Sequence, residues 1–393
     1  MGKKLDLTEP IIAWLLEPDS SRAEVAAMLR DTGKRFELAV PFRGNFDKYQ
    51  QWFLSSGTVV LNDKPLEPVE LPSIIRTVSA GTGTGIVVPT YVVFGTSETN
   101  FEKIHAMRSN IPGLSPWSGV SSLSLSFGDG SSKKTEVIAE PRNEIVIDES
   151  VGLKLRPDYS VRTSLKRDEV TARQMVSIET RVDELRGWTW HLFYHRSLLN
   201  LLTISDWVPR TFANLEVLRN EDSYELDGKK REVWHPVLSY MPRVDRSHFE
   251  NPESQYLFRF SDIREEGIRK WFELVDRCQQ GMTLLAYVAK EQEHLALETL
   301  NMLTGTILDC IGWYVVETKN QTERIQNSKT GEIRSAGFYQ MLEAVQEELG
   351  DVFPFTDPED WKRDMRKAFV GNKHGDAEGV DFQTMYDVTM ESL

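Results

Sequence analysis

The stretch IRKWFELV, residues 268–275, places apolar side chains at Ile268, Trp271, Phe272 and Val275. This is the i, i+3, i+4, i+7 spacing of an amphipathic helix. Helical spacing continues to the end of the 393-residue chain, where the next apolar stripes lie within residues 297–314, 338–349, 361–369 and 382–388. The sequence therefore predicts an all-helical part that begins near residue 262.

The residues before this point have a different apolar pattern. Residues 120–127 alternate Val, Leu and Phe with serine, the period of two that is typical of a half-buried strand. The run at residues 86–94 also reads as one strand, at a sheet edge or a bulge because of Pro89. Many such short segments, separated by Gly, Pro, Asn and Asp, predict a sandwich or barrel-like sheet. The expected fold class is α+β, with a β-rich domain at residues 1–261 and a helical bundle at residues 262–393.

Two helices are expected inside the β-rich part. A short one covers residues 23–29, and a long one covers residues 183–202 and packs across the sheet. His191 and His195 lie four residues apart on the apolar stripe of the long helix. A zinc site normally needs further ligands, so we interpret both as core histidines. The glycine-rich residues 81–85 match no phosphate-binding motif, and we interpret them as a flexible loop or hairpin.

Composition excludes several classes of protein. The chain is 40% hydrophobic and 27% charged, which leaves enough apolar surface to bury and excludes disorder for most of its length. Its apolar runs are far shorter than the roughly 20 residues that cross a bilayer, and no signal peptide is evident. Two cysteines, Cys278 and Cys310, are too few for a disulfide scaffold. We therefore expect a cytoplasmic protein with no membrane partner and no cofactor.

The net charge of -14 disfavours a broad nucleic-acid-binding surface. One segment departs from this acidic background, with its cations at Lys362, Arg363, Arg366, Lys367 and Lys373. His374 follows directly after them, and on a continuous helix it lies on the same face as Lys367 and Arg363. A histidine among cations can cleave a phosphodiester without a metal, because the imidazole moves protons while the cations stabilise negative charge. The alternative to a catalytic site is a basic helix face that is simply exposed to solvent, as most runs of charged residues are.

The chain also resembles a known family. Tyr256-Leu257-Phe258-Arg259-Phe260-Ser261-Asp262-Ile263, then Trp271-Phe272-Glu273-Leu274 and residues 291–303, resemble the ApeA type of bacterial defence protein. Trp117-Ser118-Gly119-Val120-Ser121 and the segment around residues 198–204 are similar to its N-terminal part. That family has a β-rich N-terminal domain followed by a helical HEPN domain, so the resemblance implies the same architecture here.

The resemblance also implies an activity. HEPN domains of this kind resemble metal-independent ribonucleases with an Arg, four to six residues and a His, which puts His374 at the histidine position. Arg366 and Lys367 are then the other catalytic candidates, although Arg366 is separated from His374 by seven residues. Arg363, Asn372 and Lys373 are the candidates for RNA binding.

The implied function is an antiviral ribonuclease that cleaves cellular RNA during phage infection. It would work as a homodimer, with a phage-derived trigger sensed by the N-terminal domain. The alternative is an inactive HEPN-type module that binds RNA, a nucleotide or a partner protein.

Overall fold

The structure is a computed structural model of the 393-residue chain. It describes the following residues: 10–16, 23–32, 36–43, 59–61, 64–69, 73–76, 82–88, 91–94, 101, 103–127, 135–140, 142–163, 170–239, 256–319, 337–350, 357–374 and 380–393. The chain forms two compact units. Unit 1 comprises residues 1–196 and 211–252, and unit 2 comprises residues 197–210 and 253–393. In the part that the structure describes, no helix is long and apolar enough to cross a membrane.

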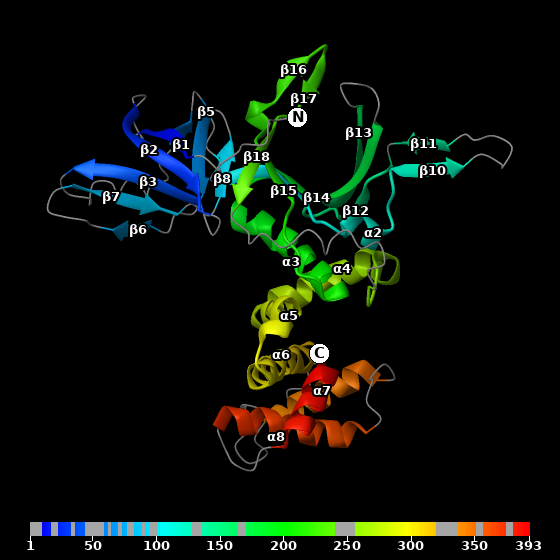
Figure 1. Cartoon of the computed structure of the whole chain (residues 1–393). Coiled ribbons are helices and arrows are strands. Elements are labelled where there is room, and N and C mark those ends of the chain that lie inside the picture. Colours follow the sequence, from blue (N-terminus) through cyan, green and yellow to red (C-terminus); the bar gives the residue numbers. More distant parts are fainter. Residues whose placement is uncertain are drawn as a thin grey trace. The chain divides into compact units, whose positions relative to one another are not determined.

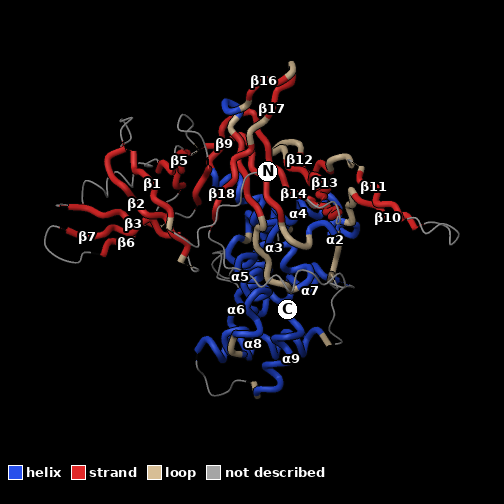
Figure 2. The backbone as a smooth tube through the Cα atoms, turned by 45° about the horizontal axis from the view of Figure 1, so that its top comes forward, coloured by secondary structure: helices blue, strands red, loops and turns tan. Residues whose placement is uncertain are grey.

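Unit 1 is built on one large antiparallel sheet, drawn as red strands in Figure 2. Its described strands follow the order β12-β13-β14-β9-β15-β18-β8-β5-β4-β1-β2-β3-β7-β6. Their bounds are β1 Ile11–Leu16, β2 Ala23–Asp31, β3 Phe36–Arg43, β4 Val59–Leu61, β5 Lys64–Val69, β6 Ser73–Arg76, β7 Thr82–Val87, β8 Tyr91–Phe94, β9 Lys103–Asn110, β12 Ile145–Asp148, β13 Leu153–Thr163, β14 Val170–Gly187, β15 Asn214–Leu218 and β18 Trp234–Ser239. Two hairpins stand outside this sheet: β10 Leu123–Phe127 with β11 Thr135–Ala139, and β16 Tyr224–Leu226 with β17 Lys229–Arg231.

The two faces of the central strands differ in character. Register pairs Leu155 with Ile178 and Thr180 with Met107, so these side chains share one face, which the helix α3 (Trp188–Asp206) covers. The core on this face combines strand and helix residues: Tyr91, Val93, Phe101, Ile104, Met107, Trp188, Leu192, Leu215, Val217 and Val237. The α+β class and the β-rich N-terminal part, with its packed helix, are confirmed.

Three local predictions for this part need correction, in whole or in part. Residues 23–29 lie in strand β2, not in a helix, because β2 pairs with both β1 and β3 and buries Ala27 and Leu29 on one face. Here tertiary pairing overrides the local preference for a helix. Residues 82–85 lie in strand β7 between β3 and β6, so of the two alternatives the loop is wrong, while the antiparallel pairing of β6 with β7 agrees with a hairpin; residue 81 lies outside the described residues. The run at 86–94 belongs to two strands, β7 and β8, which pair with different neighbours.

The long helix begins later than predicted. Residues 183–187 still belong to β14, because Arg186 and Gly187 pair with Ile104 and Lys103 of β9 after a shift in register. The helix α3 then starts at Trp188, whose indole nitrogen donates to the carbonyl of Phe101 at 2.6 Å. A short helix that was not predicted, α2 (Leu114–Ser118), lies between β9 and β10.

Unit 2 contains the C-terminal helices. They are α4 Phe260–Arg277, α5 Gln279–Glu291, α6 Leu297–Thr318, α7 Phe338–Leu349, α8 Pro358–His374 and α9 Phe382–Ser392. Within the described residues from 265 onward there is no strand, as the change of apolar period predicted. Short 3-10 turns are η1 (Asn220–Asp222) in unit 1 and η3 (Gln292–His294) here.

The helix α8 packs through the stripe that the sequence marked as apolar. Trp361, Met365, Ala368 and Phe369 are buried in a cluster with residues of α6, α7 and α9. From the sequence we also expect this stripe to pack against the helices of Trp271 and Leu300. The cluster contains residues of α6, the helix of Leu300, but among its described members none comes from α4, so the expected contact with the helix of Trp271 is wrong. The indole of Trp271 instead donates to the carbonyl of Ser197 at 2.8 Å, within the same unit.

Candidate functional site

The candidate nuclease site begins with how α8 is built. Asp357 caps the helix, since its carboxylate accepts from the backbone amides of Glu359 at 3.0 Å and Asp360 at 3.1 Å. Pro358 takes the first helical position, where its missing amide proton is not needed. Acids fill the first turn, and the exposed cations Arg366, Lys367 and Lys373 lie in the later turns, as the helix dipole favours. The apolar stripe of α8 is buried, so the opposite face of the helix, with Arg366 and Lys367, meets solvent.

The predicted cations on this face differ in how they are engaged. Arg363 is exposed and paired with Asp360 and Asp364, at 3.0 Å to the latter. Arg366 and Lys367 are exposed, and within the described part of the chain neither forms an ion pair or a hydrogen bond. As far as the described residues show, these two predicted cations are therefore unpaired and available to bind a phosphate.

The last turn of α8 holds the remaining predicted residues. Lys373 is exposed, with its ammonium 5.8 Å from the ring of Phe369. Asn372 turns inward instead, and its amide donates to Asn301 Oδ1 at 2.9 Å. Asn301 is fully buried and in turn donates to Thr389 Oγ1 at 2.9 Å. Asn372 therefore links α8 to α6 and α9, and its assignment to RNA binding stays a prediction.

His374 is the last residue of α8, so it follows Lys373 at the end of the helix. Its side chain lies outside the described residues, and its assigned role stays a prediction. Asp309 of α6 is electrostatically coupled to this end of α8: burial raises the pKa of its carboxyl, and the charge of Lys373 opposes that rise. The structure thus brings Arg366, Lys367 and Lys373 onto the exposed side of one helix that ends at the candidate histidine.

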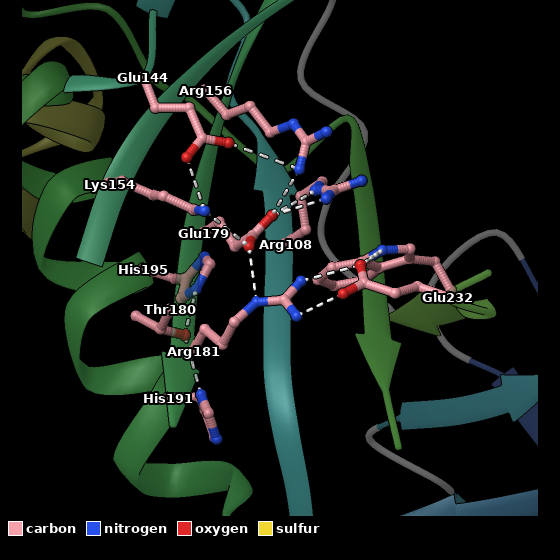
Figure 3. A network of polar contacts seen from close by, with 11 residues as sticks. Arg108, Glu144, Lys154, Arg156, Glu179, Thr180, Arg181, His191, His195 and Glu232 are labelled. Atoms are coloured by element: carbon pink, nitrogen blue, oxygen red, sulfur yellow. Dashed lines mark hydrogen bonds and ion pairs between the residues drawn. The ribbon is translucent and has the colours of Figure 1, made fainter. Parts of the chain in front are cut away.

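A second polar cluster, in unit 1, was missed by the sequence reasoning (Figure 3). Its centre is the fully buried carboxylate of Glu179 on β14. Arg108 of β9 donates to it twice, at 3.1 and 2.6 Å, and Arg181 donates at 3.0 Å. Lys154 and Arg156 of β13 lie 3.4 and 3.5 Å from its oxygens. Four cations from three neighbouring strands thus enclose one carboxylate on the sheet face opposite to α3.

The rim of this cluster holds two more acids and an aromatic ring. Glu144 pairs with Lys154 at 2.7 Å, and Glu232 pairs with both terminal nitrogens of Arg181 at 2.6 and 3.0 Å. The guanidinium of Arg108 lies 3.9 Å from the ring centroid of Trp234, a cation–π contact. An open pocket of about 470 Å³ lies beside the cluster and is lined by Arg142, Glu144, Arg156, Pro157, Asp158 and Tyr159.

The electrostatics of Glu179 define what the cluster can do. Burial alone would raise the pKa of this carboxyl, but the hydrogen bonds from Arg108 and the charges of Arg108, Lys154 and Arg181 lower it to about 2. Glu179 therefore stays ionised at neutral pH and cannot act as a general acid there. Its role is to hold the cations of three strands in one place.

The histidines of α3 lie on the other face of β14. Thr180 Oγ1 lies 2.8 Å from His191 Nδ1 and 3.0 Å from His195 Nε2. Ser109 Oγ lies 2.6 Å from His195 Nδ1, and His191 Nε2 lies 3.3 Å from the carbonyl of Ile104. A carbonyl only accepts, so His191 donates from Nε2 and accepts from Thr180 at Nδ1. The hydroxyl oxygen of Thr180 then accepts from His195 Nε2. His191 is then neutral, with its proton on Nε2.

Burial lowers the pKa of His191 to about 4 and that of His195 to about 3, which agrees with neutral rings. Both side chains are fully buried, so the interpretation as core histidines is confirmed. Among the residues that the structure describes, no group of three His, Cys, Asp or Glu could hold a metal ion. The chain of hydrogen bonds from Ser109 to Ile104 joins α3 to the sheet.

The comparisons with known proteins give one match. A family model described as ApeA N-terminal domain 1 matches residues 71–271, just over half of the chain. Neither the curated proteins nor the solved structures contain a match.

Proposed function

The chain belongs to the ApeA N-terminal domain 1 family, which indicates an anti-phage defence protein, and we propose that its helical unit is a metal-independent ribonuclease of the HEPN type. The observation that carries this proposal is the exposed face of α8. Arg366 and Lys367 are exposed cations without an ion pair among the described residues, in a protein of net charge -14. They lie on a helix whose opposite stripe is buried and whose last residue is His374.

In the proposed reaction the ribose 2′-hydroxyl of the substrate attacks the adjacent phosphorus, and the 5′-oxygen of the next nucleotide leaves. His374 transfers protons as base or acid. Arg366 and Lys367 bind the phosphate and stabilise the charge that develops on its oxygens. Each of these roles is general chemistry for an imidazole beside two cations, and none requires a metal ion. In bacteria the chain would act on cytoplasmic RNA, as a homodimer whose N-terminal unit responds to a phage-derived trigger.

Incubation of the purified chain with total cellular RNA tests the proposal. We expect the wild type to cleave RNA in the presence of a chelator, and His374→Ala to cleave about 10²- to 10⁴-fold more slowly. Arg277→Ala is the matched control, because Arg277 of α4 is also exposed and carries no ion pair within the described residues. Its cleavage rate should equal that of the wild type.

The alternative function is an inactive binding module. It is favoured if wild type and His374→Ala leave the RNA equally intact while Arg366→Ala and Lys367→Ala weaken RNA binding. The engagement of Arg363 by two acids and of Asn372 by Asn301 is consistent with such a module as well.

A further inference from the structure

The hairpin β16–β17 projects from the sheet of unit 1 between β15 and β18 (Figure 1). Its turn is Asp227–Gly228, with φ of 53° and 70°, the left-handed pair that a two-residue hairpin turn requires. In the described residues its two strands pair with each other only, and every residue of both is exposed. The hairpin therefore buries little surface, which leaves its side chains available for a ligand.

One face of this hairpin combines cations with apolar groups. The register places Tyr224 opposite Arg231 and Leu226 opposite Lys229, so these four side chains share a face. Tyr224 is 55% exposed and Leu226 is 48% exposed. Within the described part of the chain, neither Lys229 nor Arg231 forms an ion pair. We call these four residues the finger face.

The hairpin and the residues on either side of it, 221–232, contain five acids. Three of them form ion pairs with residues outside the finger face. Glu221 pairs with Arg219 at 3.1 Å, and Asp222 pairs with His235 at 2.7 Å. Glu232 is held by Arg181, as described above.

The other two acids of the segment are not on the finger face either. Glu225 lies opposite Lys230 on the other face of the hairpin, and Asp227 lies in the turn. The finger face thus presents two positive charges and one aromatic ring with no acid among its four residues.

We propose that the finger face binds single-stranded RNA, with Lys229 and Arg231 on the phosphates and the ring of Tyr224 stacked on a base. Two cations on one strand face are two residues apart, about 7 Å, and can contact successive phosphates of an extended strand. Every base has a flat π-surface, so stacking on an exposed tyrosine tolerates any sequence and requires unpaired bases. The choice of RNA rests on the proposed function, since that function requires an RNA substrate.

A binding assay with a labelled single-stranded RNA tests the proposal. The His374→Ala chain is used, so that the RNA stays intact, and binding is followed by fluorescence anisotropy over a range of salt concentrations. Lys229→Ser/Arg231→Ser should weaken binding and reduce the slope of log K against log salt by about 1.4, because each lost phosphate contact on a single strand removes about 0.7. Lys230→Ser is the matched control, because it removes the same kind of charge from the opposite face and should change binding much less.

The stacking part has its own pair of variants. Tyr224→Ala should weaken binding by roughly 5- to 150-fold, the range of one lost base stack, whereas Tyr224→Phe should bind as the parent does. All hairpin variants should keep the parent's melting temperature, because the side chains they alter are exposed. A duplex of the same RNA should bind more weakly than the single strand.

The inference is overturned if Lys229→Ser/Arg231→Ser binds within twofold of Lys230→Ser with an unchanged salt slope, or if the duplex binds as well as the single strand. RNA cleavage by the wild type is scored separately. If the binding results are as expected but no cleavage depends on His374, the proposed function is refuted and the RNA-binding role of the finger face still stands. Cleavage that depends on His374, with hairpin variants that bind normally, would refute the finger face alone.

Discussion

The tight contact between α6 and α8 gives a prediction about stability. The substitution Gly305→Ala should destabilise the chain when Phe369 is present and stabilise it when Phe369 is replaced by alanine. A Cβ atom added at Gly305 of α6 would lie 2.1, 2.5 and 2.7 Å from three ring carbons of Phe369. Alanine in a helix is favoured over glycine by about 1 kcal/mol, but overpacking a core costs about 1–3 kcal/mol. Since all three distances are far inside van der Waals contact, we expect Gly305→Ala to lose roughly 1–2 kcal/mol of stability.

Removal of the ring reverses the effect. Phe369→Ala alone should cost about 3–5 kcal/mol, because Phe369 is buried in the cluster of α6, α7, α8 and α9. In that background the ring no longer obstructs a methyl group at position 305, so Gly305→Ala should stabilise the chain by roughly 0.5–1 kcal/mol through helix propensity. The coupling between the two changes is then about 1.5–3 kcal/mol, which a double-mutant cycle resolves.

Urea unfolding followed by helical circular dichroism measures all four chains of the cycle. Gly312→Ala is the control, because a Cβ there would meet Met341 Cβ at 2.5 Å and the Met341 backbone at 2.8 Å. Its cost should be the same with and without Phe369. Equal destabilisation by Gly305→Ala in both backgrounds would refute the packing of α8 through Phe369, and with it the outward placement of Arg366 and Lys367.

Further predictions concern pH, the buried carboxylate and the cations of α8. The neutral state of His191 and His195 stabilises the fold fully above the unfolded pKa of about 6.5, and this stability is lost as the pH falls toward their folded pKa values of about 4 and 3. Between pH 7.5 and 5.5 unfolding measurements should show a loss of about 2–3 kcal/mol, and a flat profile would contradict neutral buried rings. Glu179→Gln should cost roughly 3–5 kcal/mol, because it leaves buried cations without their anion, and a cost below about 1 kcal/mol would mean that the cluster is solvated. Lys367→Ala should slow RNA cleavage more than Arg366→Ala does, because Lys367 shares the helical face of His374. The reverse order would assign the arginine position to Arg366.

The helical part was predictable from the sequence because the spacing of apolar residues along a helix is a local pattern. The stripe of Trp361, Met365 and Phe369 is visible in the residues themselves, and the buried face of α8 follows from it. The partners of that face were not predictable, since nothing in the sequence states that α8 meets α6 and α7 and not α4. Such contacts are set by the path of the chain between the helices.

The Glu179 cluster shows a different limit. Lys154 and Arg156, like Glu179 and Arg181, are two residues apart, so each pair was readable as one face of a strand. That β9 lies beside β14 depends on pairing between residues far apart in the sequence, such as Arg108 and Glu179, which are 71 positions apart. The sequence pattern does not show which strands pair or which of their residues lie opposite one another.

The hairpin β16–β17 is a case where a readable signal was overlooked. Asp227–Gly228 between two short exposed strands is a strong sequence signal for a two-residue turn. The strands themselves are rich in charge and carry no apolar alternation, so the periodicity that identified the other strands was absent. Only the turn residues mark this hairpin in the sequence.

The central claim is that the helix face ending at His374 cleaves RNA. It is tested most directly by examining the RNA of phage-infected bacteria that express the chain. We predict new RNA fragments after infection in cells with the wild type, and intact RNA in cells with an equal amount of His374→Ala. Fragments that persist in the His374→Ala cells, or RNA that stays intact in both, would contradict the account.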